Sequence, residues 1–391
     1  NWQGLAAEAL LYSPVYQIIT SPTSEYNIRG NITYNEPLAQ YSSLSIQYRL
    51  SYEDELKDQE AFYYDKNFDP NSQKINQQMT SKYESGYWTH RVGPGFRYSK
   101  NRNTIVANVY YQRSMLEGNI VGGQSDKIDR TFNNFLYFGM INYAFNKENS
   151  IRLFLRSSTN APSVTQLQNI FDVSTPQFLS VGNQDLNPSF THRLNFHYIH
   201  SNIEKGRTFM WMFSTQLSQD YIGQSVIYNP TKEDMPGLPD DVEYAPLQYS
   251  TYENMDGYAQ LRTHLSYGFP IAPIKCNLNV MAGVSWTRTP SKVNNELNYT
   301  SNMGYDAMVS LGSNISENID FTLQWNGAYN DARQSLAMRG NNKNQYFSHT
   351  ASGTLKWVFW KGFTLTAAVN YNQYIGFTND YNEDYLLCNV Y

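Results

Sequence analysis

Long apolar runs are missing from this chain, and cysteine is almost absent. No stretch of the 391 residues approaches the roughly 18 consecutive apolar side chains that a membrane-crossing helix requires, which argues against a helical membrane protein. The two cysteines, Cys276 and Cys388, lie far apart, without CxxC spacing or a histidine companion. We interpret both as structural. Such low cysteine usage is compatible with export to an oxidising compartment.

Charged residues are also scarce. They make up 16% of the chain, and the formal net charge is -5. A nucleic-acid-binding protein needs a basic surface to neutralise phosphates, so nucleic acid is excluded as an expected partner. The sequence contains no GxSxG, HExxH, GxGxxG or phosphate-loop pattern. We therefore predict that the chain is not an enzyme, with no catalytic residue and no cofactor.

Two groups of possible metal ligands do not have the arrangement that a metal site needs. Asp65, Asn67 and Asp69 have the spacing of a calcium loop, but Pro70 stands where that loop needs a flexible glycine. His192, His197 and His200 are close in sequence. Strand periodicity nevertheless sends His197 to the face opposite the other two, so the three cannot converge on one ion. No metal site is predicted.

What the chain does contain is alternation of apolar and polar residues. In SLSIQYRLS, Leu44, Ile46, Tyr48 and Leu50 fall on one face, and the serines, Gln47 and Arg49 fall on the other. The same pattern recurs in CNLNVMAGVSW and IDFTLQW. Aromatic residues make up 15% of the chain, with 33 tyrosines. One wet face and one apolar face are typical of membrane-spanning β-strands.

The predicted strands number about 14, most near the roughly 9 to 11 residues that a tilted membrane strand needs. Short polar turns are expected at Lys100, Asn146, Ile203, Ile315 and Trp360, and long loops after Tyr52, Ser114, Ser157, Ser218, Thr287 and Asn330. This alternation predicts an all-β, antiparallel up-and-down transmembrane barrel. Pro94 predicts a bulge within its strand. A soluble propeller or sandwich is the alternative, although such proteins have shorter strands.

Parity also predicts which polar side chains line the lumen. The candidates for a substrate path are Arg29, Arg49, Arg152, Arg156, Arg193, Asn195, Asn277 and Asn279. For any single one, hydration of the interior or contact with a plug is the simpler role. Tyr34, Tyr98, Tyr143 and Tyr267 are placed as an interfacial girdle near the short turns, with Tyr52 and Trp286 at the opposite rim. Loop tyrosines at 221, 228, 244 and 249 are candidates for stacking on a ligand.

Two stretches resemble a known family. In the first, a strand ending at Arg156 is followed by Pro162, Ser163, Gln166 and Leu167, and then by Gly182, Asn183, Leu186 and Pro188 of GNQDLNP. In the second, Asn254 and Gly257 lead a strand. Both resemble the barrels of TonB-dependent receptors, in particular the SusC-like branch. Gln184 and Ser189 depart from the usual pattern. We expect the motif to shape a loop, with Gly182 free to adopt a positive φ and Pro188 holding Asn187 extended.

The resemblance implies a larger barrel of roughly 22 strands with an N-terminal plug. Residues 1–391 are thus expected to be one outer-membrane β-barrel domain, a fragment incomplete at both ends and without the plug. The implied function is TonB-coupled uptake of a scarce, bulky nutrient, such as a glycan, a peptide or a metal chelate. The implied partners are outer-membrane lipid, the missing plug domain and TonB, with a surface-exposed substrate-binding lipoprotein as a further candidate. A passive porin and a surface adhesin or structural barrel are the alternative functions.

Overall fold

A computed structural model describes residues 16–76, 80–121, 126–169, 171, 177–237, 246–313, 316–336, 343–376 and 382–390. Within these ranges, 20 strands join into one sheet. The helices described there are single turns, such as α2 (Val164–Leu167) and the 3-10 segment η4 (Ala272–Ile274). None of them is long or apolar enough to cross a lipid bilayer.

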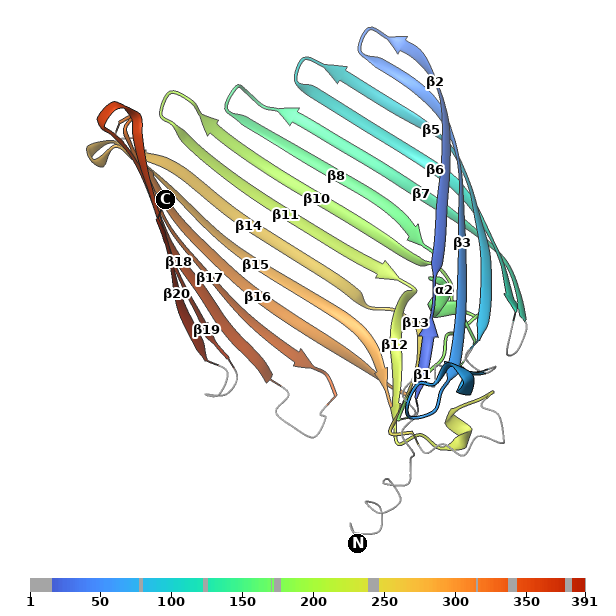
Figure 1. The fold of residues 1–391 in the computed structure, drawn as a ribbon. Helices are drawn as coiled ribbons and strands as arrows, with labels where there is room; N and C mark the ends of the chain where they lie inside the picture. Colours follow the sequence, from blue (N-terminus) through green and yellow to red (C-terminus); the bar gives the residue numbers. More distant parts are fainter. Residues whose placement is uncertain are drawn as a thin grey trace.

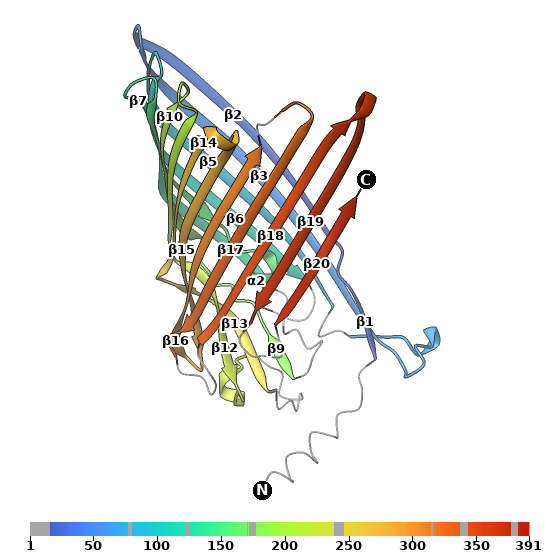
Figure 2. The same cartoon turned by 90° about the vertical axis from the view of Figure 1, so that its left-hand side faces the viewer.

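Fifteen strands form a curved wall in which each strand pairs antiparallel with the next one along the wall (Figure 1). They are β2 (Thr23–Ala39), β3 (Ser42–Tyr63), β5 (Ser81–Lys100), β6 (Asn103–Val121), β7 (Asp126–Ala144), β8 (Asn149–Asn160), β10 (Ser189–Asn202), β11 (Arg207–Gln219), β14 (Tyr258–Ile271), β15 (Cys276–Val293), β16 (Glu296–Ser313), β17 (Ile319–Gln334), β18 (Lys343–Phe359), β19 (Phe363–Ile375) and β20 (Glu383–Val390). The predicted fold class is confirmed. Strands β2 and β20 are the two edges, and no pairing among the described residues closes the sheet between them (Figure 2).

The outer face of the wall carries the apolar members of the alternating pattern. Leu44, Ile46 and Leu323 are exposed there, Ile46 at 60% and Leu323 at 50%. Pairing keeps this parity from strand to strand, since Ile46 lies opposite Tyr34 and Leu323 lies opposite Leu311. A row of exposed apolar side chains that would be costly in water is favourable against lipid. The six residues predicted for the aromatic girdle and the opposite rim all lie on this outer face.

One end of the wall carries tight turns. The backbone at Asn101, Gly206 and Gly362 is left-handed there, with φ of 55°, 60° and 94°. The sequence analysis missed two further turns at this end, between Ala39 and Ser42 and across η4. These two turns and four of the five predicted ones share the end expected for short turns, which keeps neighbouring strands antiparallel. The turn predicted at Ile315 lies outside the described residues.

The opposite end departs from the prediction, because many strands are longer than a membrane requires. β3 has 22 residues and β6 has 19, so the predicted loops after Tyr52 and Ser114 are strand instead. The long loop predicted after Thr287 is also wrong. There β15 and β16 join through Asn294 and Asn295, both with positive φ, as a two-residue hairpin turn requires. The wall therefore projects beyond the apolar band at this end.

The buried core lies at this projecting end. Short strands gather there: β1 (Gln17–Thr20), β4 (Lys74–Ile75), β9 (Phe178–Ser180), β12 (Tyr221–Tyr228) and β13 (Gln248–Met255). One apolar cluster contains Leu179, Met235 and Tyr249, and a second joins Leu167 and Leu186 of the loop to wall residues such as Tyr83. The long connections thus pack into a folded cap with its own core.

Pro94 does not produce the predicted bulge. β5 runs unbroken through it, and the register with β6 is the same before and after Gly93 and Pro94, where the pairs are interrupted. Pro94 keeps its pairing with Ile46 on β3. A Cβ at Gly93 would collide with the backbone carbonyl of Val109, so the close approach of β6 requires glycine here.

Candidate functional site

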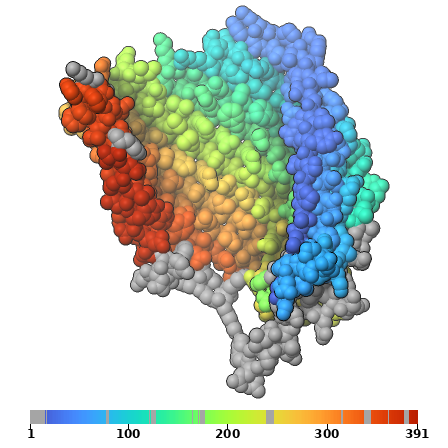
Figure 3. All heavy atoms as spheres, in the orientation of Figure 1, coloured from blue at the N-terminus to red at the C-terminus, as the bar shows by residue number. Residues whose placement is uncertain are grey.

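The concave face of the wall is visible through the open side in Figure 3. All eight predicted lumen residues lie on it, because the register links them through partners of the same face. They do not form one site. Arg29 and Arg49 lie on β2 and β3, the residues from Arg152 to Asn195 lie on β8 and β10, and Asn277 and Asn279 lie on β15. Their role in a substrate path stays a prediction.

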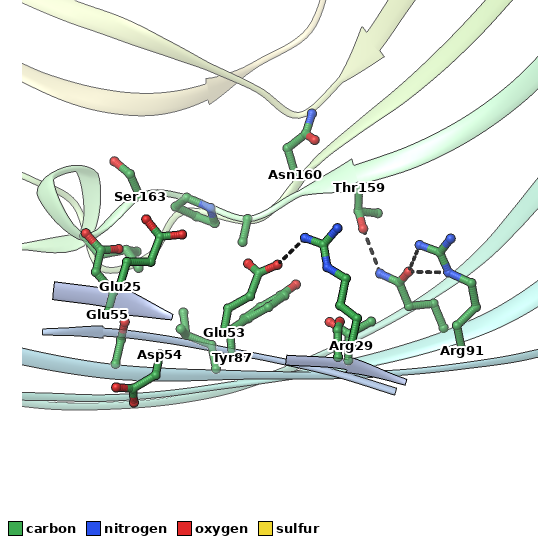
Figure 4. Close-up of a pocket in the computed structure, with 18 of the residues that line it drawn as sticks. Glu25, Arg29, Glu53, Asp54, Glu55, Tyr87, Arg91, Thr159, Asn160 and Ser163 are labelled. Atoms are coloured by element: carbon green, nitrogen blue, oxygen red, sulfur yellow. Dashed lines mark hydrogen bonds and ion pairs between the residues drawn. The ribbon is translucent and has the colours of Figure 1, made fainter. Parts of the chain in front are cut away.

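A cavity of about 530 Å³ opens on this face beside β2, β3, β5 and β6. Ser51, Tyr87 and Thr89 line it from the wall, and it is covered by Asn160 at the end of β8 and by Ser163 just after that strand. Figure 4 shows the side chains of Glu25, Glu53, Glu55, Arg29 and Arg91 turned into this space, whereas Asp54 points to the opposite side of the sheet. Its size falls in the roughly 300–1,000 Å³ range of sites for small molecules.

Charged groups in the cavity are paired only in part. The Arg29 Nη2 atom lies 3.1 Å from Glu53 Oε1, and Asn27 Nδ2 donates to the same oxygen at 2.6 Å. Arg91 instead donates from Nε (3.0 Å) and Nη2 (2.5 Å) to the neutral amide oxygen of Gln112. The Gln112 amide in turn donates to Thr159 Oγ1 at 2.8 Å, which connects β6 to the end of β8. Arg91 is thereby oriented without being neutralised.

The first family-like stretch folds onto the inner face at the cap. Ser163 and Gln166 bond reciprocally, each side chain accepting from the backbone N–H of the other, in a capping box at the start of α2. This turn buries Leu167, which is 1% exposed. Pro162 and Pro188 flank the segment, Pro162 buried and lining the cavity.

Gly182 is required for a different reason from the one expected. Its φ is not among the positive values, but a Cβ there would lie 2.6 Å from the Gln168 carbonyl oxygen and 2.7 Å from that of Gln166. Close packing of two backbone segments, rather than a left-handed turn, therefore demands glycine. The Gly182 N–H donates to Gln168 O at 2.9 Å as part of this contact.

An arginine missed by the sequence analysis holds the GNQDLNP loop. Arg130 on β7 donates to the carbonyl oxygens of Gln184 (3.1 Å) and Leu186 (2.8 Å) and to Asn187 Oδ1 (2.8 Å). The second family-like stretch closes the arrangement. Asn254 Oδ1 accepts from the Asn187 N–H at 2.8 Å, and its amide donates to the Asn187 carbonyl at 2.9 Å. The two resembling stretches, distant in sequence, therefore meet in one hydrogen-bonded cluster.

Three of the four predicted loop tyrosines lie in strands instead of a loop. Tyr221 and Tyr228 belong to β12 and Tyr249 belongs to β13, while Tyr244 lies outside the described residues. Tyr249 is 6% exposed inside the cap core. Tyr221 stacks on Tyr258 with ring centroids 4.7 Å apart. Hairpin formation by β12 and β13 turned this expected loop into structure.

No group of three or more histidine, cysteine or acidic side chains in the described ranges has the geometry of a metal site. The histidines have other roles. His192 Nδ1 lies 2.6 Å from Tyr137 Oη, and His200 Nδ1 lies 2.9 Å from Asn149 Oδ1. His197 pairs with Arg152 on the inner face, so the predicted separation of His197 from the other two is confirmed.

The sequence analysis missed Glu25, Glu53, Glu55 and Arg91 as cavity residues. Their side chains share a face only because of how β2, β3 and β5 pair, and a single sequence does not give that register. A usable signal was present for Glu53 and Glu55, which continue the inner-face parity of Gln47 and Arg49. This signal is weak, because the alternation of apolar and polar residues fades after Tyr52.

Comparison with known proteins agrees with this architecture. The chain matches the outer membrane protein beta-barrel family over residues 11–384. No curated protein matches in sequence. Among solved structures, it is similar to the copper transporter OprC with a TM-score of 0.55 and 10% identity, covering 95% of this chain and 56% of that one.

The ferric enterobactin receptor PfeA of Pseudomonas aeruginosa is also similar, with a TM-score of 0.41 and 10% identity; 90% of this chain aligns to 64% of that one. The chain thus spans less than two thirds of either structure. The resemblance drawn from the sequence is confirmed at the level of family and fold. With an antiparallel wall, an apolar outer face and a match over most of its length, the chain belongs to the outer membrane protein beta-barrel family, and its location is the cell outer membrane.

Proposed function

We propose that this barrel takes part in TonB-coupled uptake of a scarce, bulky nutrient, and so in transport rather than catalysis. One observation carries the proposal: the two stretches that resemble TonB-dependent receptors meet at Asn187 and Asn254 and fold over the inner face. A loop held against the inner face narrows the lumen beside it, which agrees with an energy-coupled receptor better than with an open pore. The copper transporter OprC, which shares the fold, is named for transport of a metal.

On this proposal, residues 1–391 form the wall of a larger barrel domain, and the plug and TonB are its partners. The inner-face residues from Arg29 to Asn279 then contact the plug or the passing solute. A surface lipoprotein that delivers substrate would dock at the cap, where the long connections pack together.

The test is growth on candidate nutrients in cells that carry the intact gene, with and without TonB function. Growth should depend on TonB, and the purified full-length protein should show no steady conductance in planar bilayers. Uptake that persists without TonB, together with open-channel conductance, would favour a passive porin instead. Loss of surface attachment when the cap is deleted, with neither uptake nor conductance, would favour an adhesin.

A further inference from the structure

The cavity contains two like-charge pairs of opposite sign on adjoining strands. Glu25 on β2 lies directly opposite Glu55 on β3, and Arg49 on β3 lies directly opposite Arg91 on β5. Like charges facing each other across a sheet are destabilising. No ion pair to any of these four side chains occurs within the described ranges, unlike the neighbouring Arg29 and Glu53, which neutralise each other.

The positive end of the cavity has a third arginine near its two facing ones. Arg91 is held by the neutral Gln112 amide, and Arg156 on β8 is near enough for its charge to repel that of Arg91. At the negative end, burial and then the Glu25 carboxylate raise the pKa of Glu55, while Lys57 opposes that shift in part. Each end thus holds charge that a ligand group of opposite sign would stabilise.

The distance between the two charged ends of the cavity follows from the number of residues between them on β3. Glu55 and Arg49 are six positions apart on β3, which corresponds to about 20 Å at roughly 3.3 Å per residue. An extended peptide has the same rise, so about six of its residues span the distance. Between the ends, Ser51 and Thr89 offer hydroxyl groups, Tyr87 offers an aromatic face, and the neutralised Arg29–Glu53 pair lies beside them. Such a lining suits a polar chain better than a compact apolar solute.

We propose that this cavity binds an extended oligopeptide with free ends, its ammonium group at Glu25 and Glu55 and its carboxylate at Arg49 and Arg91. The proposal rests on the uptake function above and narrows its substrate class. The intervening backbone lies along β3, where the hydroxyl groups and Asn160 supply hydrogen bonds. A glycan lacks both end charges, and a carboxylate-rich chelate lacks the cationic one.

The test is calorimetric titration of the complete protein in detergent with peptides of alternating alanine and serine, three, six and nine residues long. The hexapeptide with free ends should bind most tightly. Acetylating its amino end or amidating its carboxyl end should weaken binding about tenfold each, as expected for loss of one charge-assisted contact. Saturable binding that ignores length and end groups, or no saturable binding of the hexapeptide, would overturn the proposal.

Variants show which end of the peptide each pair of charged residues binds. Arg49→Gln should weaken the free-ended hexapeptide about tenfold but leave the amidated one unchanged, and Glu55→Gln should do the same for the acetylated one. Arg102→Gln and Glu204→Gln, exposed in turns at the other end of the wall, are controls with no expected effect. Retained heat-modifiable gel mobility verifies folding of each variant. If peptides fail while another nutrient still enters by a TonB-dependent route, only the peptide assignment falls.

Discussion

A lysine placed at neighbouring positions of β17 tests which face of the wall meets lipid. Leu323 is the fifth residue of this strand counted from the short-turn end at Ile319, and a tilted strand crosses the bilayer in about 10 residues. Leu323 is therefore near the midplane, half exposed on the outer face. Leu323→Lys should lower the free energy of unfolding by about 2–4 kcal/mol, the measured range for a lysine at that depth.

Thr322→Lys is the matched control. Thr322 faces the lumen opposite Gly312, and the space beside Gly312 holds no atom within 4 Å, so a long side chain fits there and stays hydrated. Its cost should stay below about 1 kcal/mol. Both variants are to be unfolded from lipid vesicles in the full-length protein. Equal costs, or a greater cost for Thr322→Lys, would refute the assigned faces.

Three further outcomes follow from the cap and the cavity. Arg130→Gln removes three charge-assisted hydrogen bonds from the loop, so deuterium exchange of the loop amides should accelerate about 10-fold or more, with unchanged exchange in β17 as the control. Unchanged exchange of the loop amides would contradict this role of Arg130. Gly182→Ala should destabilise the protein by about 1–3 kcal/mol in thermal unfolding, whereas Gly312→Ala, with open space around it, should be near neutral. Because the pKa of Glu55 is raised in the folded state, its charge destabilises above the ordinary value of 4.5; Glu55→Gln should therefore increase stability at neutral pH, and the gain should vanish as pH falls below 4.5. A gain that persists in acid would contradict that origin.

The faces of the wall were predictable from the sequence because alternation is a local property. Leu44, Ile46 and Arg49 reveal their faces without knowledge of a partner strand, and tight turns such as the one at Asn101 leave a polar signature. Strand ends at the projecting side were not predictable in this way. There the residues after Tyr52 are polar on both faces, so the pattern fades although pairing continues to Tyr63.

Only some of the residues that line the cavity were predictable from the sequence. Arg29 and Arg49 were assigned to the lumen by parity, but their neighbours were not, because contacts across strands depend on register. The GNQDLNP loop was predicted to have a structural role, but the reason why it needs a glycine is different from the one expected. Gly182 serves close packing against Gln166 and Gln168, which lie far from it in the sequence and near it only after folding.

The cap core has a consequence for how the two parts of the molecule respond to temperature and solvent. The wall in lipid depends on hydrogen bonds that no water competes for. By contrast, the cluster around Leu179, Met235 and Tyr249 is surrounded by the aqueous phase and depends on the hydrophobic effect. Cooling and urea both weaken that effect. The surface of this barrel should therefore loosen on cooling or in mild urea while the membrane part remains unchanged.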